Sequence, residues 1–414
     1  MVKRNRVVIT GMGVLAPNGI GLDAFWESVL HCRSGIGPIT LFDASRFKTQ
    51  IAGEIKDFDP ADYIEPELKP KRMARHTQLA YAATMMALKD AGLEINNLSL
   101  PSPTPVVIGV STSAIDVIES VHFAVERGTP NRAPVSSAAA SIPQAAANTI
   151  ADRIGACANA TTVSSACPSG LDALADAAAM IRSGEVEAAV AGGADAPITP
   201  LTLASFIGSG LVSASNGEPE TASKPFDLTR ESGVLAEGAG IFVLENWERA
   251  LARGARAYVE IEGYGKQRDT DREKPASGLF DSMRLALANA GRSIDDVDYI
   301  SAYGPGDPTL DAAEVAVIKQ LFGARAYEIP ITSIKGVTGN PLGASGPLQV
   351  AACALAIRDR RIPPTANLKS FDPSCDLDFV PGQARRGKID CALINVRGIG
   401  GSASTLLLRR PDNG

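Results

Sequence analysis

Histidine is scarce in this sequence, with only His31, His76 and His122 among 414 residues. Each lies in a predicted helix or at the end of one, and outside any motif that would give it a role. We therefore expect three ordinary surface or core histidines. Because histidine is the side chain most often used for proton transfer near neutral pH, chemistry in this chain must rest on other groups.

Other features are missing as well. The six cysteines show no CxxC pair and no metal-ligand spacing, which fits a reducing cytoplasm better than a disulfide framework. No apolar run approaches the roughly 20 residues of a membrane span, and no signal peptide is expected before the strand at Arg6–Thr10. Acids and bases are interspersed, with a net charge of −6, so we expect no nucleic-acid partner. We expect a cytoplasmic protein without membrane insertion or a metal site.

The stretch Thr161–Gly184 organises the rest of the chain. Small polar residues lead to Cys167, and a helical pattern with an apolar face follows Pro168. Proline is favoured in the first helical turn, so Cys167 is predicted at or just before a helix N-terminus. Free backbone N–H groups and the helix dipole lower a thiol's pKa there, and the thiolate is the nucleophile. The alternative is a buried structural cysteine. The short apolar strand and glycine-rich turn over Val186–Asp195 favour the nucleophile.

Strands and helices alternate along the chain, and the pattern restarts near Arg256. The segments Ala87–Gly92 and Ala286–Gly291 resemble each other, and each ends a predicted helix ahead of a strand. This alternation predicts a duplicated α/β unit, with two sheets and helices between and outside them. A Gly-x-Gly turn is predicted at Gly11–Gly13, but the third glycine of a dinucleotide site is missing.

Five blocks of sequence carry a resemblance to a known family. They are Val163–Gly170, Pro225–Arg230, Glu237–Gly240, Lys335–Gly339 with Gly343–Gly346, and Asn395 with Gly398–Gly401. Over essentially its whole length the chain resembles the β-ketoacyl-ACP synthases (ketosynthases, KAS II-like) of type II fatty-acid and polyketide synthesis. The resemblance implies a thiolase-like α/β fold of duplicated halves in five layers (α-β-α-β-α). The halves would be residues 1–255, carrying Cys167, and 256–414, carrying Tyr303, Lys335 and Asn340.

The resemblance also implies a substrate and partners. The substrate would be an acyl chain on the phosphopantetheine arm of an acyl carrier protein, with no other cofactor, and the subunits would dimerise through their sheet edges. Cys167 falls on the nucleophile position that accepts the acyl chain, and Lys335 on a lysine near the active site. Further implied positions are substrate contacts and a gating or oxyanion loop: Phe206, Thr309, Ile399 and Gly400. Ile399 replaces the family's gating phenylalanine, and Arg397 precedes it.

Both catalytic histidines of the family are replaced, by Tyr303 and Asn340. The two threonines that would hydrogen-bond the pantetheine are replaced by Pro305 and Asp307. A phenol and a carboxamide can donate to the thioester oxygen while a malonyl group loses carbon dioxide, but neither is a general base near neutral pH. The loss of one such donor typically lowers the rate by about 10²–10³.

The replacements leave several functions open. The histidine losses and the run Gly304–Glu314 resemble the chain-length-factor branch, whose members pair with a catalytic ketosynthase. That branch usually replaces the cysteine too, whereas Cys167 is retained. We expect a partner subunit of a catalytic ketosynthase first. The alternatives are a self-standing 3-oxoacyl-ACP synthase using Cys167, Tyr303 and Asn340, and an acyltransferase that needs only the thiolate and an oxyanion hole. A structural protein without acyl substrates is the last alternative.

Overall fold

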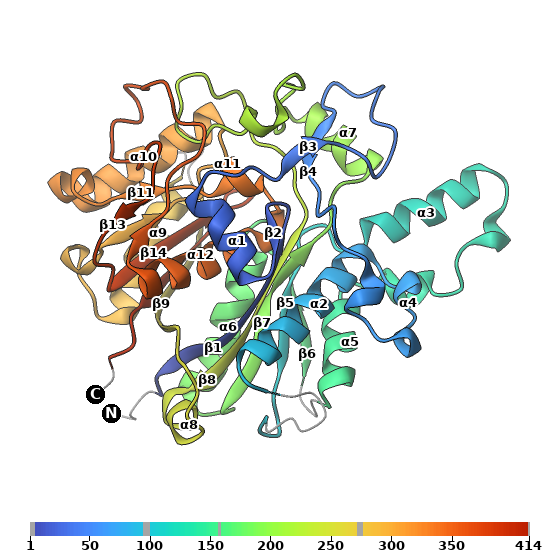
Figure 1. The fold of residues 1–414 in the computed structure, drawn as a ribbon, viewed down its shortest axis with the longest axis horizontal. Coiled ribbons are helices and arrows are strands. Elements are labelled where there is room, and N and C mark those ends of the chain that lie inside the picture. The colour runs from blue at the N-terminus through green and yellow to red at the C-terminus, as the bar shows by residue number, and fades with distance from the viewer. Residues whose placement is uncertain (1–4, 94–99, 156–158, 271–275, 413–414) are drawn as a thin grey trace.

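A computed structural model describes residues 5–93, 100–155, 159–270 and 276–412. Its main sheet follows the strand order β11-β10-β14-β15-β9-β1-β8-β7-β5-β6 (Figure 1). The first half of the chain supplies β1 (Val7–Ala16), β5 (Val106–Gly109), β6 (Ala160–Val163), β7 (Ala188–Asp195) and β8 (Gly238–Asn246). The second half supplies β9 (Val259–Arg268), β10 (Tyr299–Ser301), β11 (Ile331–Thr332), β14 (Cys391–Arg397) and β15 (Ser402–Arg409). Shorter strands pair as β2 (Gly19–Ile20) with β1, β3 (Ile36–Pro38) with β4 (Ile51–Gly53), and β12 (Arg361–Ile362) with β13 (Arg385–Arg386).

The two halves repeat one topology. From the edge inward, the first runs β6-β5-β7-β8-β1 and the second runs β11-β10-β14-β15-β9. In each half the three outer strands are parallel and the next two pairings are antiparallel. The halves join where β1 pairs with β9, at Val8↔Glu260 and Ile9↔Val259, so the two expected sheets form one continuous path. The predicted duplication of an α/β unit is confirmed.

Helices lie in layers on both faces of this path. Two central helices, α6 (Ser169–Ser183) and α12 (Ser345–Asp359), pack on each other and contact strands of both halves. On the outer faces, α2 (Arg75–Asp90) covers β1, β7 and β8, and α9 (Ser277–Ala290) covers β9, β14 and β15. The remaining helices are α1 (Leu22–Leu30), α3 (Ile115–Glu126), α4 (Ser137–Ala140), α5 (Ala145–Ile154), α7 (Pro200–Gly208), α8 (Trp247–Ala252), α10 (Pro308–Phe322) and α11 (Lys335–Thr338).

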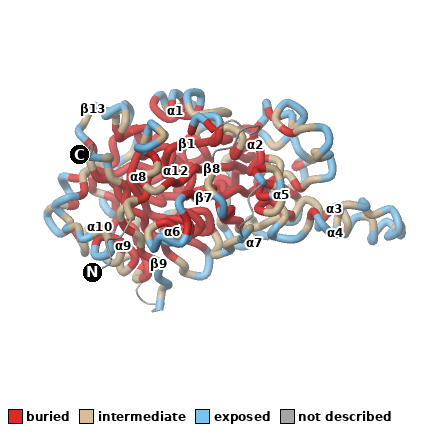
Figure 2. Tube along the Cα trace, turned by 90° about the horizontal axis from the view of Figure 1, so that it is seen from below, coloured by how far each residue is buried: buried red, intermediate tan, exposed pale blue. Residues whose placement is uncertain are grey.

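The core follows from the sequence pattern. The predicted apolar face of the Cys167 helix, formed by Leu171, Leu174, Ala178 and Ile181, is buried in α6. Figure 2 shows burial concentrated in the strands and in α6 and α12, while the arm formed by α3 and α4 extends from the body and is mostly exposed or half-buried. Among the described residues, no helix combines the length and apolar character needed to cross a bilayer.

The Gly11–Gly13 segment is part of strand β1 and does not form the predicted turn. A Cβ atom on Gly13 would lie 1.9 Å from the Ala83 carbonyl oxygen of α2. In the second half, a Cβ atom on Gly265 would lie 2.0 Å from the Ser282 carbonyl oxygen of α9. These glycines therefore let each outer helix approach its strand closely, which explains the Gly-x-Gly pattern without a nucleotide.

The helices α4 and α5 are separate, with a break between them. Pro143 lies in the break, where its ring and missing N–H interrupt a helix.

Candidate active site

Cys167 lies on a tight junction between β6 and α6. The preceding residue, Ala166, has a φ of +64°, an uncommon conformation for a residue with a side chain. Pro168 caps the helix, which begins at Ser169. A Cβ atom on Gly109 of β5 would lie 2.2 Å from the backbone of Ser169, so the helix start is packed directly on the sheet. The predicted position of Cys167, just before a helix N-terminus, is confirmed.

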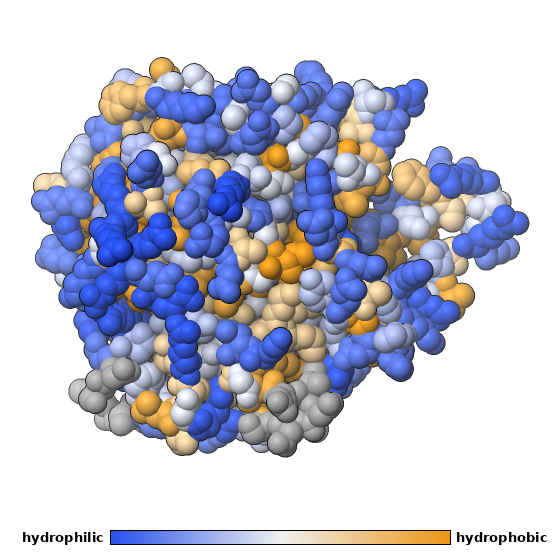
Figure 3. All heavy atoms as spheres, in the orientation of Figure 1, coloured by the Kyte–Doolittle hydropathy of each residue, from blue (hydrophilic) through white to orange (hydrophobic). Residues whose placement is uncertain are grey.

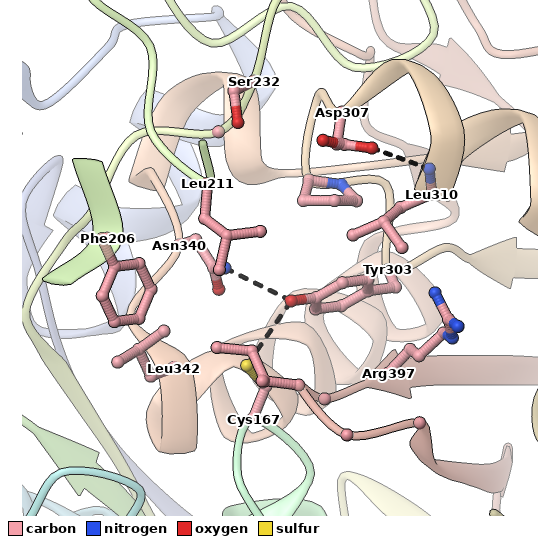
Figure 4. Close-up of a pocket in the computed structure, with 16 residues that line it drawn as sticks. Cys167, Phe206, Leu211, Ser232, Tyr303, Asp307, Leu310, Asn340, Leu342 and Arg397 are labelled. Atoms are coloured by element: carbon pink, nitrogen blue, oxygen red, sulfur yellow. Dashed lines mark hydrogen bonds between the residues drawn. The ribbon is translucent and has the colours of Figure 1, made fainter. Parts of the chain in front are cut away.

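A chain of hydrogen bonds joins three predicted site residues (Figure 4). The Tyr303 hydroxyl donates to Cys167 Sγ at 3.5 Å, and Asn340 Nδ2 donates to the Tyr303 oxygen at 3.3 Å. Ser345 Oγ lies 3.5 Å from Asn340 Oδ1, which fixes the amide orientation. Cys167 and Tyr303 are 2% and 5% exposed. The Tyr303 hydroxyl therefore lies between the sulfur and the Asn340 amide, and both side chains are donors that can reach an oxygen bound near the sulfur.

Burial raises the pKa of the Cys167 thiol, although the Tyr303 hydrogen bond and the Lys335 charge oppose the increase. The expectation of a lowered pKa at the helix N-terminus is therefore wrong. Removal of water from around the sulfur penalises the thiolate more than these two neighbours stabilise it. The thiol is accordingly the resting form near neutral pH.

This raised pKa gives a prediction. The rate of Cys167 alkylation by iodoacetamide should keep rising from about pH 7 to about pH 9 without a plateau, because the thiolate fraction grows with pH below the raised pKa. Lys335 loses its charge near pH 8, which makes the rise less than tenfold per pH unit. Peptide mass spectrometry of the labelled protein measures the rate at Cys167, and Cys167→Ala identifies the peptide. A rate that levels off below about pH 8 would contradict the prediction.

Lys335 is a buried cation beside the same site. Its Nζ atom lies 4.5 Å from the centre of the Tyr303 ring and donates to Gln349 Oε1 at 3.3 Å. Burial lowers the pKa of Lys335 to about 8, against the attraction of Glu314, Cys167 and Asp311. Lys335 thus holds Tyr303 from its ring face and supplies positive charge near the sulfur.

Glu314 of α10 fixes the backbone at Tyr303. Its carboxylate accepts the N–H groups of Tyr303 at 3.0 Å and Gly304 at 2.9 Å, and it accepts Asn395 Nδ2 at 3.2 Å. Glu314 is 2% exposed. Glu314 and Gln349 are site-forming residues that were not among those predicted from the sequence. A signal was present, because each is a polar residue within a mainly apolar helical pattern.

A cavity of about 250 Å³ opens onto Cys167, Tyr303 and Asn340. Phe206, Ile399 and Gly400 line it as predicted contacts, and Pro305 and Asp307 line it where the family's threonines are expected. Other lining residues are Leu211, Ser232, Gly233, Leu310, Leu342, Arg397, Gly398 and Gly401. Ile399 is 59% exposed. Thr309 is exposed in the first turn of α10 and does not line the described cavity, so the structure does not bring it to the site.

The described lining of this cavity contains none of the chain's three histidines. His76 is buried in α2, His122 is exposed on α3, and His31 follows α1 with a half-exposed side chain. The residues that face Cys167 across the cavity therefore offer hydrogen-bond donors without an imidazole base.

Comparisons with known proteins agree with this geometry. Two family models match the chain: "Beta-ketoacyl synthase, N-terminal domain" at residues 4–250, and "Beta-ketoacyl synthase, C-terminal domain" at residues 258–369. The chain is 39% identical to the tetracenomycin polyketide synthase ketoacyl synthase alpha subunit of Streptomyces glaucescens, over 98% of the chain and 97% of that protein. It is 37% identical to 3-oxoacyl-[acyl-carrier-protein] synthase 2 of Synechocystis sp., over 99% of each.

Solved structures of ketosynthases superpose on this chain over almost its whole length. The ishigamide ketosynthase/chain length factor superposes with a TM-score of 0.91 at 33% identity, over 99% of this chain and 100% of that one. A type II PKS acyl-carrier protein in complex with its ketosynthase, bound to the hexaketide, superposes with a TM-score of 0.90 at 30% identity, over 99% of this chain and 100% of that one.

Proposed function

The chain belongs to the β-ketoacyl synthase family and has its thiolase-like fold; from this premise we propose a function for it in type II fatty-acid or polyketide synthesis. Its Cys167 accepts an acyl group from an acyl carrier protein, and the subunit works beside a second ketosynthase that retains the catalytic histidines. The halves 1–255 and 256–414 each contribute to the site, the first with Cys167 and the second with Tyr303, Lys335 and Asn340.

The proposal depends on one observation: Cys167 lines a cavity and accepts a hydrogen bond from Tyr303, whose hydroxyl oxygen in turn accepts one from Asn340. In acyl transfer the Cys167 thiolate attacks the carbonyl carbon of the acyl thioester. The new bond joins that carbon to Cys167 Sγ, and the carbon–sulfur bond to phosphopantetheine breaks. The pantetheine thiolate then takes up the proton that Cys167 released. Tyr303 and Asn340 donate to the carbonyl oxygen while it carries negative charge.

We expect the condensation step to be slow in this site, because it lacks the two histidines of the family. Decarboxylation of a malonyl thioester breaks the bond to the carboxylate carbon, releases carbon dioxide, and leaves an enolate. The enolate carbon forms a bond to the acyl carbon on Cys167, the bond from that carbon to Cys167 Sγ breaks, and Cys167 leaves as a thiolate that takes up a proton. The Tyr303 and Asn340 donors are neutral, and burial raises the pKa of Tyr303 far above its usual range. This favours a helper role in which a histidine-bearing partner performs condensation.

A second candidate function is a self-standing 3-oxoacyl-ACP synthase or acyltransferase. The retained nucleophile favours it, because both neutral donors reach the sulfur region and Lys335 adds positive charge. The two candidates differ in whether carbon–carbon bond formation needs a second, histidine-bearing chain.

We propose a dimer formed at the open edge strand β6, as a homodimer or as a heterodimer with a catalytic ketosynthase. The Val163 carbonyl accepts the Val110 N–H at 3.0 Å on the side of β5, so Thr162 turns its backbone groups toward the open edge. The nearby arm carries Phe123, Val125 and Val135 among its exposed apolar residues. Figure 3 shows some orange atoms among hydrophilic ones on the protruding lobe that the arm forms. Such a surface favours a protein partner.

The test incubates the purified chain with acyl-ACP and measures the mass of the Cys167 peptide. We expect an acyl adduct at Cys167 in the wild type, complete loss of it in Cys167→Ala, and an unchanged adduct in the matched control Cys32→Ala. Product analysis with malonyl-ACP then compares the chain alone with the chain mixed with a histidine-bearing ketosynthase.

The outcomes separate the candidates. Condensation only in the mixture, with a heterodimer in native mass spectrometry, supports the helper role. Condensation by the chain alone supports the self-standing synthase. A protein that forms no adduct and releases no carbon dioxide contradicts both.

A further inference from the structure

Arg397 introduces a cation into the wall of a largely apolar cavity. It is the last residue of β14, and its neighbours in the cavity lining include Leu310, Pro305 and Ile399. The Arg397 side chain is 14% exposed. A guanidinium in such surroundings is costly unless a partner compensates it, so its presence needs an explanation.

A carboxylate outside the cavity lining provides part of that compensation. Arg397 Nη2 donates to Asp269 Oδ2 at 2.5 Å, and Asp269 does not line the described cavity. Asp269 also accepts the Gly278 N–H at 2.8 Å, so this carboxylate is shared. The Arg397 Nε atom is buried and has no hydrogen-bond partner within residues 5–93, 100–155, 159–270 and 276–412. A guanidinium has five N–H donors, and Asp269 leaves most of them unused.

The guanidinium acts on the reactive group as well. Burial raises the pKa of Tyr303, and the Arg397 charge is among the influences that oppose this increase. Figure 4 shows Arg397 and Asn340 on opposite sides of Tyr303. A substrate whose thioester lies near Cys167 and Asn340 can therefore present a second polar group to Arg397.

We propose that Arg397 makes this cavity selective for thioesters that carry a carboxylate. A planar guanidinium with free N–H donors matches a carboxylate in a bidentate arrangement, and both charges gain from the exclusion of water. The carboxylate comes either from a malonyl extender unit or from the far end of a dicarboxylic acyl chain. The inference rests on the proposed function for its thioester class, and Arg397 acts in it as a specificity residue.

The test measures binding without reaction. Titration calorimetry compares pantetheine amides, which cannot transfer their acyl group and carry no phosphate. The pairs are malonyl against its methyl ester, and glutaryl against its methyl ester. For wild-type protein we expect the carboxylate compound of one pair to bind at least about tenfold more tightly than its ester. This factor is of the order expected for a charged hydrogen-bonded pair. A preference in the malonyl pair identifies the extender unit as the source of the carboxylate, and a preference in the glutaryl pair identifies the far end of a dicarboxylic chain.

Two variants test the residue. Arg397→Met should remove the carboxylate preference by weakening the binding of the acid far more than that of the ester, whereas Arg397→Lys should keep part of the preference. Ester binding reports that the cavity is intact, so a folding defect is recognised. Equal binding of acid and ester by the wild type, or an equal loss of both in Arg397→Met, would overturn the inference. Failure of Cys167 to take up an acyl group would instead contradict the proposed function, because these amides bind without transfer.

Discussion

Replacing Tyr303 and Asn340 together by histidine should increase the release of carbon dioxide from malonyl-ACP by about 10²–10³, the usual contribution of one well-placed donor to an oxyanion. The Tyr303 hydroxyl now stands between Cys167 Sγ and the Asn340 amide. The shorter imidazole leaves space there for the thioester oxygen. Imidazole also exchanges protons near neutral pH, which a phenol and a carboxamide do not.

Radiolabelled carbon dioxide release from malonyl-ACP measures this gain. The matched control is Tyr303→Phe with Asn340→Ala, which removes both present donors and should give a rate at or below that of the wild type. Acyl transfer to Cys167 should survive in the histidine variant, since the nucleophile is unchanged. A folded double-histidine variant with the wild-type rate would mean that these two side chains do not limit decarboxylation.

Removing the Glu314 carboxylate should lower the free energy of unfolding by about 3–5 kcal/mol. This is the range observed when one partner of a buried charged interaction is removed and the other partner stays buried. Glu314→Ala leaves the N–H groups of Tyr303 and Gly304 and the amide of Asn395 without their acceptor. It also removes an attraction that supports the charged form of buried Lys335.

Urea denaturation followed by circular dichroism measures this loss. Glu314→Gln keeps one acceptor oxygen and the side-chain volume, so its loss should be clearly smaller than that of Glu314→Ala. Glu328 offers a control, because it is an exposed residue beyond the C-terminal end of α10 that pairs with Arg325. Glu328→Ala should change stability by less than about 0.5 kcal/mol. Equal stability of Glu314→Ala and wild type would show that the carboxylate does not organise the Tyr303 backbone.

Much of the fold could be predicted from local patterns. The apolar face of α6, the position of Cys167 before that helix, and the restart of the α/β pattern all follow from residue spacing and turn residues. The break between α4 and α5 has a local cause at Pro143, since proline interrupts a helix by its own geometry. The course of β1 through Gly11 and Gly13 could not be predicted locally, because α2, a helix distant in sequence, packs so closely on this strand that only glycine fits there.

The sequence predicted which residues come together in the candidate site better than it predicted how they are arranged. Cys167, Tyr303, Asn340 and Lys335 do come together, whereas Thr309 stays on the surface of α10. A helix turn places neighbouring residues on different faces, so Leu310 lines the cavity while Thr309 is exposed outside its lining.

The sequence by itself determined the resemblance to the family, through its motifs, and the duplicated architecture and the replacement of both expected histidines, because motifs, spacing and composition are properties of the chain. Only the tertiary structure decided that the pKa of Cys167 is raised, that Tyr303 forms a hydrogen bond to a sulfur 136 residues away, and that Arg397 lines the cavity beside that sulfur. The physical reason is that desolvation and charge–charge distances depend on which distant segments exclude water from each other, and this is fixed only when the two halves pack.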